Sequence, residues 1–513
     1  MDKFADRVKR LFIRPAGGIG IIFLLTFIAY SNIFRNQFIL DDHDYIENWP
    51  LIQDWRNFPQ FFWGYVPPAG QEGVFSPLKT LLHAVNYHLF GLNPSGYHVA
   101  GLFNYFVTVY FIYRTSFYLI KEYRIAFITT LLFALHPVHA EYVASMTGSV
   151  DAAGITFLFV AFFFYIRSHG PSSGLNKKRY IVAVLFAFLA MFAHELTLSL
   201  PFLLLWYDFC FLREKSSRKG IAGRVMPFFI IGAVYILLKF LVLKSITRGH
   251  YLYDSFELTM LVIVKALMKY VYICFLPIVL THNHVIADGI FSFDQDDFDR
   301  YAVLSQSWLD GQVLMALLLL GSIFYIAVRK WEQEPLVTFC LGWFFISLLP
   351  VLNIVPSGVY FAERYLFVGT FTFCLLLAYY INKLRRSNRL GLARISVFMI
   401  MALVVFDIVR IRTRNQELRD DVSLFESAVR ANPQSALMHN DLGIVYAKHG
   451  KPQQALASFR QALAIRTDDP VTYFSMAQAY IQLDDKKKAA DALEQAIILN
   501  PRYAEAHYNL AGL

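Results

Sequence analysis

The sequence predicts an all-α protein in which a polytopic membrane domain is followed by a solenoid of paired helices. Of the 513 residues, 57% are hydrophobic and only 17% are charged, which is more apolar surface than a soluble core needs. Uncharged apolar stretches of about 18 residues or more recur along the chain, and a helix of that length crosses a bilayer. After Arg414 the composition turns polar and rich in alanine, and similar residues recur every 34 positions.

Charge and cysteine content exclude two other classes. The formal net charge of +9 does not indicate nucleic-acid binding, because the basic residues gather in short loops between apolar segments, where they report orientation. The four cysteines lie far apart inside apolar segments, without the spacing of metal ligands, so we interpret them as core residues. We therefore predict membrane lipids as surroundings and no nucleic-acid partner.

Eleven transmembrane helices are predicted in a membrane domain that covers residues 1–410. Basic residues such as Lys3 and Arg7 place the N-terminus in the cytoplasm, so the first span, about 17–34, emerges outside at Asp41. The other spans are expected at about 97–119, just before His136, at 152–166, twice within 180–212, and at 225–243, 313–328, 336–352, 367–381 and 392–409. This order leaves the C-terminus on the extracytoplasmic side.

Three segments of this domain are not predicted as spans. Residues 36–77 form the first extracytoplasmic loop, and residues 78–90 form a helix on the interface, because their apolar residues follow helical spacing. The segment 257–280 is apolar enough to cross, but Lys265 and Lys269 put two charges on one face. We interpret it as an interfacial or re-entrant helix, because a crossing would reverse the sidedness of every later basic turn.

The acceptor sequence for N-glycosylation does not occur, since proline blocks Asn93-Pro94-Ser95. This favours a bacterial inner (cytoplasmic) membrane, with the active site and the repeats extracytoplasmic. The endoplasmic reticulum membrane is the alternative.

Residues 415–513 carry the 34-residue period of tetratricopeptide repeats. Small residues recur where two helices cross closely, and large residues fill the gaps between repeats. The equivalent positions are Gly443, Ala477 and Ala511; Phe425, Phe459 and Leu493; Ala428, Ala462 and Ala496; Ala455 and Ala489; and Tyr446 and Tyr480. We expect an α-solenoid whose concave groove recognises an acceptor protein or peptide.

Two adjacent acids, Asp41 and Asp42, directly follow the first span, and acids at that depth are costly unless they have a function or a partner. We expect one of them to be a general base in sugar transfer from a lipid phosphate. That reaction needs one base for the acceptor hydroxyl and one fixed cation for the phosphate, and Arg364 at the outer end of a span suits the second role. The structural alternative is that the acids cap an interfacial helix and that Arg364 pairs with Glu363 or extends to the interface.

Other polar residues at the outer face are candidates for the donor and acceptor pocket. His136, His139 and Glu141 either hydrogen-bond to the acidic loop or the donor, or bind a metal, although Pro137 breaks their helical spacing. No cofactor is assigned, and a divalent metal is the open alternative. His194-Glu195 is either a structural tether or a sugar contact. The predicted pocket residues are His136, His139, Glu141, His194, Glu195, Glu363, Tyr365 and Lys79.

Several motifs in order resemble one known family. The segments 36–42, 75–78, 90–94, 136–141, 349–353 and 362–365, with the C-terminal repeats, resemble the transmembrane and tetratricopeptide-repeat-containing O-mannosyltransferases. The resemblance implies a GT-C fold and inverting transfer of a mannose-like sugar from a polyprenyl-phosphate donor to an extracytoplasmic hydroxyl, such as that of protein Ser or Thr. It also implies that an acid of the first outer loop is the base, which matches Asp41 and Asp42. At His194-Glu195 the family more often has Lys-Glu, which puts the role of that cation in question.

A different function class is the alternative. A non-enzymatic membrane assembly or export component would use its repeats to dock a partner protein. A solute transporter fits less well, because the polar residues gather at one face and not at mid-membrane.

Overall fold

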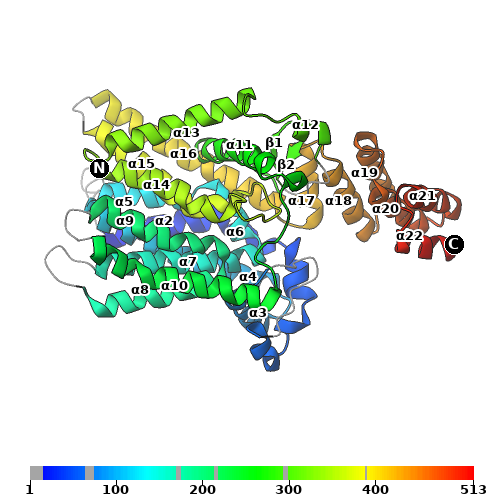
Figure 1. Cartoon of the computed structure of the whole chain (residues 1–513), viewed down its shortest axis with the longest axis horizontal. Helices are drawn as coiled ribbons and strands as arrows, with labels where there is room; N and C mark the ends of the chain where they lie inside the picture. The colour runs from blue at the N-terminus through cyan, green and yellow to red at the C-terminus, as the bar shows by residue number, and fades with distance from the viewer. Residues whose placement is uncertain (1–14, 64–73, 169–174, 213–217, 293–297, 387–389) are drawn as a thin grey trace, which may run out of the picture. The chain divides into compact units, whose positions relative to one another are not determined.

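The computed structural model describes residues 15–63, 74–168, 175–212, 218–292, 298–386 and 390–513, and its regular structure is almost entirely helical (Figure 1). The first α-helices are α2 (Pro15–Tyr30), α3 (Pro77–Phe90), α4 (Pro94–Ile120), α5 (Tyr123–Ala134), α6 (Ala140–Ala144), α7 (Met146–Ser168), α8 (Lys177–Ala193), α9 (Leu200–Phe211), α10 (Arg218–Leu243) and α11 (Phe256–Phe275). They are followed by α12 (Arg300–Leu304), α13 (Gly311–Lys330), α14 (Pro335–Leu348), α15 (Phe367–Arg385), α16 (Leu390–Glu417), α17 (Asp421–Ala431), α18 (Ala436–Lys448), α19 (Pro452–Ile465), α20 (Pro470–Gln482), α21 (Lys486–Leu499) and α22 (Ala504–Ala511).

Short helical turns and one small sheet complete the described structure. The turns are η1 (Ser31–Arg35), η2 (His43–Glu47), η3 (Pro50–Ile52), η4 (Trp55–Phe61), η5 (Pro137–His139), η6 (Glu195–Ser199), η8 (Leu252–Asp254), η10 (Leu349–Val351) and η11 (Glu363–Leu366). The strands β1 (Val285–Ala287) and β2 (Ile290–Phe291) pair antiparallel, with Val285 opposite Phe291 and Ala287 opposite Ile290. The predicted all-α class is confirmed.

The chain divides into two compact units. Unit 1 comprises residues 1–278 and 306–416, and unit 2 comprises residues 279–305 and 417–513. The segment 279–305 is expected from sequence to belong to the membrane domain, but it folds with unit 2. Within that unit Asn432 donates a hydrogen bond to the carbonyl of Asn283, and the His282 ring packs edge-on against Phe425.

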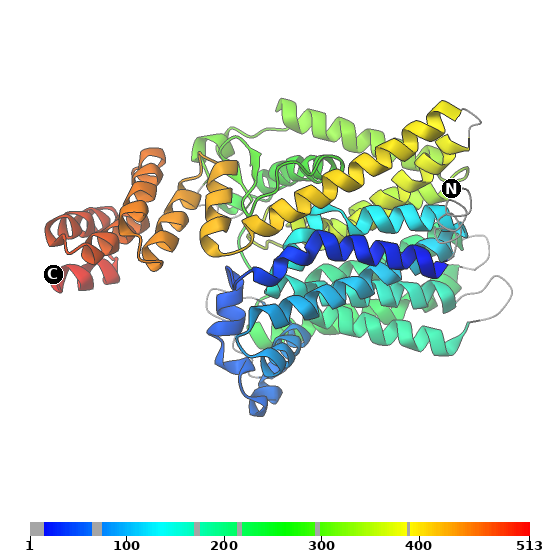
Figure 2. The same cartoon turned by 180° about the vertical axis from the view of Figure 1, so that it is seen from behind.

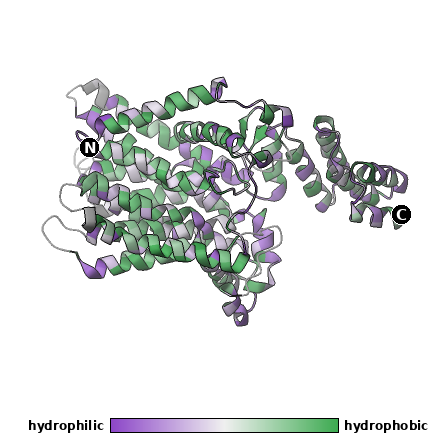
Figure 3. Ribbon diagram, viewed as in Figure 1, coloured by the Kyte–Doolittle hydropathy of each residue, from purple (hydrophilic) through white to green (hydrophobic). Residues whose placement is uncertain are grey.

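Helices of unit 1 match the predicted spans. Among the described residues, six helical segments are long and apolar enough to cross a membrane, in α2 with η1, α7, α10, α11, α13 and α15 with η11. Five of these six coincide with predicted spans, and the sixth, α11, is the segment expected at 257–280 as an interfacial or re-entrant helix. The other six predicted spans are helices as well, namely α4, α5, α8, α9, α14 and α16. Figure 3 shows hydrophobic residues along these helices, and the chain is a multi-pass membrane protein.

Burial separates the central helix of unit 1 from the lipid-facing ones. The span of α7 is 83% buried because α7 packs between α4 and α8. The spans of α10 and α13 are only 22% and 11% buried. Their exposed side chains include Ile230, Leu237, Leu318 and Phe324, which is the pattern of helices that contact lipid.

Two contacts of α11 with the start of α13 bear on whether α11 crosses the membrane. The indole nitrogen of Trp308, just before α13, donates a 2.7 Å hydrogen bond to Glu257 at the start of α11. The first turns of α11 and α13 therefore lie at the same end of unit 1. Lys265 is buried, with Asp310 at 3.2 Å, so its charge is compensated inside the protein. That α11 makes no net crossing stays a prediction, which these contacts support.

The first and the last span of unit 1 are joined by side-chain hydrogen bonds. Figure 2 shows α2 and α16 on the same side of the bundle. Asn32 donates to the carbonyl of Arg412 at 2.9 Å, and Asn415 donates to the side-chain oxygen of Asn32 at 2.8 Å. These bonds fix the chain at the end of the first span, ahead of the turn that carries Asp41.

Helix α3 occupies the position of the predicted helix 78–90. It begins with Pro77 in its first turn, where a missing N–H costs nothing, and ends at Gly91, whose φ of +57° suits glycine. Its inner face, with Lys79 and His83, is buried against α4, α7 and α8. The helix therefore delivers Lys79 to the polar cluster described below.

Unit 2 contains the helix pairs that the 34-residue period predicts. Helices α18 and α19 form one pair and α20 and α21 the next, each pair in close contact. A Cβ atom at Gly443 would lie 2.4 Å from the ring of Phe459, so glycine lets α18 approach α19. The predicted tetratricopeptide solenoid is confirmed.

Candidate active site

Asp41 and Asp42 lie in one tight turn and differ in burial. Leu40 has a φ of +48°, a left-handed conformation that costs a residue with a Cβ atom of order 1 kcal/mol. The Asp42 side chain is fully buried, and its oxygens accept the main-chain N–H groups of Ile39 at 3.2 Å and Thr147 at 2.7 Å. Asp41 is exposed. Asp42 thus holds the turn to the start of α7, and the turn presents Asp41.

Burial raises the pKa of Asp42 to about 6, against the opposing effect of its backbone hydrogen bonds to Thr147 and Ile39. Two donated N–H groups favour the charged carboxylate, but the loss of hydration has the larger effect. The Asp42 side chain makes no capping hydrogen bond to the following turn η2, and it binds the first turn of α7 instead.

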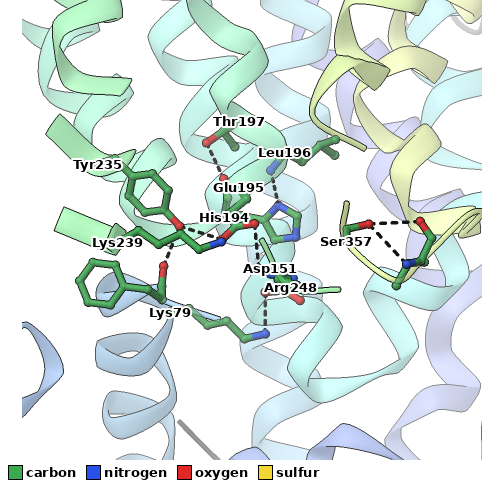
Figure 4. Close-up of polar contacts among 12 residues, drawn as sticks. Lys79, Asp151, His194, Glu195, Leu196, Thr197, Tyr235, Lys239, Arg248 and Ser357 are labelled. Atoms are coloured by element: carbon green, nitrogen blue, oxygen red, sulfur yellow. Dashed lines mark hydrogen bonds and ion pairs between the residues drawn. The ribbon is translucent and has the colours of Figure 1, made fainter. Parts of the chain in front are cut away.

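Lys79 and Asp151 join α3 to α7 (Figure 4). Their Nζ and Oδ1 atoms are 2.9 Å apart, and the two side chains are only 9% and 15% exposed. The Lys79 ammonium also lies 4.2 Å from the ring centre of Tyr45, a cation–π arrangement. Tyr45 in turn lies within electrostatic reach of Asp41, Arg248 and Glu195 as well as Asp151. This ring therefore contacts Lys79 of the charged cluster and lies within electrostatic reach of the exposed acid.

Glu195 binds two cations. Its Oε1 atom is 2.9 Å from the ammonium of Lys239 in α10, and its Oε2 atom is 2.9 Å from the guanidinium of Arg248. Tyr235 donates to Glu195 at 3.1 Å (Figure 4). Burial opposes ionisation, but the charges of Arg248 and Lys239 outweigh it and lower the pKa of Glu195 to about 2. The carboxylate is therefore ionised at every physiological pH.

His194 lies among these charges and is neutral. Its Nδ1 atom accepts the N–H of Leu196 at 3.1 Å, so in the neutral ring the proton sits on Nε2, which faces the hydroxyl of Tyr142 at 3.4 Å. Burial lowers the pKa of His194 to about 4, although the neighbouring Asp151 opposes the shift. The predicted pair His194-Glu195 is thus a neutral ring beside a permanently charged carboxylate.

Arg364 is held by Glu141 from two sides. Its Nη1 atom donates to Oε1 at 2.6 Å, and its main-chain N–H donates to Oε2 at 3.2 Å. The Arg364 side chain is still 32% exposed. Tyr142 and Tyr365 lie within electrostatic reach of this arginine, and Tyr142 also of Asp151. These tyrosines connect Arg364 to the cluster around Asp151.

Glu363, which the structural alternative paired with Arg364, has a different partner. Its Oε2 atom is 3.7 Å from Nη2 of Arg414, and both side chains are 1% exposed. Glu363 therefore fastens η11 to α16, and it is separate from the Arg364–Glu141 pair.

His136 and His139 lie in the packed interior. The Nε2 atom of His136 donates to the carbonyl of Cys274 at 3.1 Å. The ring of His139 is hydrogen-bonded to Tyr105 at 2.9 Å and to Thr370 at 2.7 Å. Their partners come from α4, α11 and α15 and not from the acidic loop that we expected, because Pro137 turns both rings toward the bundle. Of the motif 136–141, only Glu141 reaches the charged cluster.

Metal ligation was the alternative for these histidines. Among the residues that the structure describes, no group of three or more His, Cys, Asp or Glu side chains is placed to hold a metal ion.

Sequence reasoning missed several members of the cluster, among them Tyr45, Lys239 and Arg248. Lys239 lies inside the predicted span 225–243, and an ionisable residue in an apolar span is itself a signal of a partner or a function. Arg248 and Tyr45 lie in loops, where the sequence gives no such contrast.

The comparisons with known proteins agree with the motifs. Two family models described as tetratricopeptide repeat match residues 409–470 and 446–513. Protein O-mannosyl-transferase Tmtc3 of Drosophila melanogaster is 25% identical, over 90% of this chain and 56% of that protein. Protein O-mannosyl-transferase TMTC3 of Mus musculus is 24% identical, over 91% of this chain and 53% of that protein. The chain thus spans about half the length of these relatives.

A crystal structure of ArnT from Cupriavidus metallidurans bound to undecaprenyl phosphate also aligns with the chain. It is 12% identical, with a TM-score of 0.45, and the alignment covers 94% of this chain and 80% of that one. The predicted resemblance is confirmed by the sequence relatives: the chain is similar to protein O-mannosyl-transferases over about nine-tenths of its length.

Proposed function

We propose that this chain is a membrane glycosyltransferase of the GT-C type that moves a sugar from a polyprenyl-phosphate donor to a hydroxyl group of an extracytoplasmic acceptor. One observation carries the proposal. The exposed carboxylate of Asp41 and the ion pair Arg248–Glu195 lie within electrostatic reach of Tyr45, the ring that Lys79 of the pair Lys79–Asp151 covers. Arg364, paired with Glu141, shares the neighbour Tyr365 with Arg248. A glycosyl transfer from a lipid phosphate needs this combination of one accessible base and fixed cations.

Asp41 is the base in this proposal, and Asp42 positions it. The Asp41 carboxylate takes the proton of the acceptor hydroxyl as that oxygen attacks the anomeric carbon. The bond from the anomeric carbon to the phosphate oxygen breaks on the opposite face, and the electron pair leaves with the phosphate. One displacement of this kind inverts the configuration at the anomeric carbon, and no general acid is required because the leaving phosphate is a stable anion.

Arg364 supplies a cation for the phosphate. Glu141 fixes the guanidinium through Nη1 and the main-chain N–H, and the other guanidinium nitrogens offer donors to phosphate oxygens. The partial exposure of the side chain leaves room for a ligand.

The names of the relatives support mannose as the sugar and a protein hydroxyl as the acceptor. The tetratricopeptide repeats would then bind the acceptor protein or peptide. The sidedness of the basic loops supports an extracytoplasmic site, in a bacterial inner membrane or, alternatively, in the endoplasmic reticulum membrane.

The experiment uses the purified full chain in lipid nanodiscs. Polyprenyl phosphates that carry labelled mannose, glucose or galactose are offered with a Ser/Thr peptide pool, and transfer is scored by mass spectrometry. We expect Asp41→Asn to lower the rate by about 10²–10⁴-fold, the usual contribution of a general base, and Arg364→Ala to abolish transfer. Asp54→Asn, an exposed acid in the same loop paired with Arg56, is the matched control and should transfer at the wild-type rate. Full activity of the Asp41 and Arg364 variants would refute the proposal.

A non-enzymatic docking component is the second candidate, and the repeats of unit 2 favour it. In that case the wild-type chain would transfer none of the labelled sugars. Instead, deletion of residues 417–513 would abolish its function, and Asp41→Asn would leave that function unchanged.

A further inference from the structure

We propose that Arg248 is a second phosphate-binding cation, which holds the phosphate as it leaves the sugar. The inference rests on the proposed function and assigns to that site a residue from the loop between α10 and α11.

The charges around Glu195 do not cancel. One carboxylate is shared by two cations, Lys239 and Arg248, so the triad carries one excess positive charge. The pairs Lys79–Asp151 and Arg364–Glu141 are each neutral. Among these three groups only the triad carries a surplus positive charge, and an anion bound at Arg248 would neutralise it.

Exposure shows which cation of the triad faces a ligand. The Lys239 side chain is 6% exposed, whereas that of Arg248 is 32% exposed, the same fraction as Arg364. The contact of Arg248 with Glu195 uses its Nη2 atom, and a guanidinium has five N–H donors in a fork that matches phosphate oxygens. Lys239 thus secures Glu195 from inside, and Arg248 presents donors outward.

The loop of Arg248 is tied to the loop that leads to Arg364. The main-chain N–H of Arg248 donates to the carbonyl of Pro356 at 3.2 Å, and the hydroxyl of Tyr251 donates to the carbonyl of Ile354 at 2.9 Å. A Cβ atom at Gly249 would lie 2.8 Å from the nitrogen of Gly358, so glycine allows the two loops to touch. Arg248 therefore lies on a loop that is in direct contact with the loop leading to Arg364.

The two arginines share a neighbour. Tyr365 lies within electrostatic reach of both Arg248 and Arg364, and Tyr45 lies within reach of both Arg248 and Asp41. Figure 4 shows Arg248 beside Asp151 and the Glu195 group. Arg248 thus shares one neighbouring tyrosine with the proposed base and another with the first phosphate cation.

Sugar transfer from a lipid phosphate is favoured by a surplus positive charge at the position of Arg248. A sugar phosphodiester carries one negative charge, and the released lipid phosphate carries close to two at neutral pH. The charge on the phosphate grows as the bond to the sugar breaks, so a fixed cation there stabilises the transition state more than the bound donor. Arg248 therefore contributes to turnover more than to donor affinity, and it contributes to affinity for the product lipid.

The test measures lipid binding and sugar transfer separately, on the full chain in nanodiscs. Undecaprenyl phosphate and uncharged undecaprenol are titrated by native mass spectrometry. We expect Arg248→Ala to weaken undecaprenyl phosphate binding at least 10-fold without changing undecaprenol binding, and to lower kcat more than it raises KM for the donor. Arg248→Lys, which keeps the charge, should recover part of both losses. Arg56→Ala, whose side chain is 90% exposed beside Asp54, is the matched control and should behave as wild type.

Each outcome decides the inference. Wild-type affinity of Arg248→Ala for undecaprenyl phosphate, or a wild-type chain that binds both lipids equally, overturns it. Should Arg248→Ala not fold, Arg248→Gln keeps donors for Glu195 without the charge, and wild-type binding by that variant overturns the inference equally. A wild-type chain that transfers no sugar refutes the proposed function alone, because the binding titration still decides the role of Arg248.

Discussion

Lys79 of α3 and Asp151 of α7 form an ion pair of 2.9 Å that is largely withdrawn from solvent. The same lysine covers the ring of Tyr45 from the turn η2. The pair therefore fastens three separate segments of unit 1 beside the candidate site. A partly buried pair of this kind is costly to break, because removal of one partner leaves the other charge uncompensated.

We predict that Lys79→Ala destabilises the protein by about 3–5 kcal/mol, the usual cost of an uncompensated buried charge. The double variant Lys79→Ala/Asp151→Ala should recover part of this loss, because both charges are then absent. Thermal unfolding in detergent measures the effect. Arg56→Ala removes a cation from the exposed pair Arg56–Asp54 and should leave the unfolding midpoint unchanged. Equal midpoints for Lys79→Ala and wild type would contradict the assigned pairing.

We predict that Asp42 makes stability depend on pH between about 4 and 6. Burial raises its pKa from 3.8 to about 6 in the folded protein. The raised pKa of Asp42 therefore adds to the free energy of unfolding below pH 3.8. This stabilising contribution is lost as the pH rises through 6, a change of about 3 kcal/mol. Asn cannot ionise, so the difference in unfolding midpoint between wild type and Asp42→Asn should shift across this window and stay constant above it. A difference that is flat from pH 4 to 8 would show that Asp42 does not titrate there.

The architecture could be predicted from the sequence because it rests on local patterns. Apolar length places the spans, and the period of 34 places the helix pairs of the solenoid. Arg364 and Glu195 stood out as ionisable residues at the ends of apolar runs. The partners of these residues could not be predicted, because pairing depends on how each helix is rotated. Glu141 rather than Glu363 binds Arg364 for this reason.

The different roles of Asp41 and Asp42 could not be predicted from the sequence either. It depends on the left-handed backbone of Leu40, a conformation that leucine rarely adopts and that no residue pattern announces. The two histidines of the motif 136–141 illustrate the same limit. Their spacing suits a polar surface, but the turn at Pro137 directs both rings to carbonyl and hydroxyl groups of the interior.

We predict that Gly154→Ala impairs the site through packing alone. A Cβ atom at Gly154 in α7 would lie 2.8 Å from Cβ of His194 and 3.2 Å from Cβ of Ala193. The turn that carries His194 and Glu195 must then move, which costs about 1–3 kcal/mol and displaces the triad around Glu195. Sugar transfer and the unfolding midpoint should both fall. Gly223→Ala is the control, since a Cβ atom there meets nothing within 4 Å, and alanine should be neutral or mildly stabilising. Unchanged transfer by Gly154→Ala would mean that the turn tolerates the shift.

We predict that alanine can replace Gly443 without a large loss of stability only if Phe459 is replaced by a smaller residue at the same time. Gly443 faces Phe459, and 34 residues later Ala477 packs in one cluster with Leu493. In the second pair alanine takes the place of glycine and leucine takes the place of phenylalanine, so the two pairs fill similar volumes. Gly443→Ala alone should therefore destabilise unit 2 by about 1–3 kcal/mol through overpacking. Gly443→Ala/Phe459→Leu, which copies the second repeat, should restore most of the loss. Limited proteolysis of residues 417–513 in the full chain measures both effects, and equal resistance of wild type and the single variant would disprove the close packing of α18 on α19.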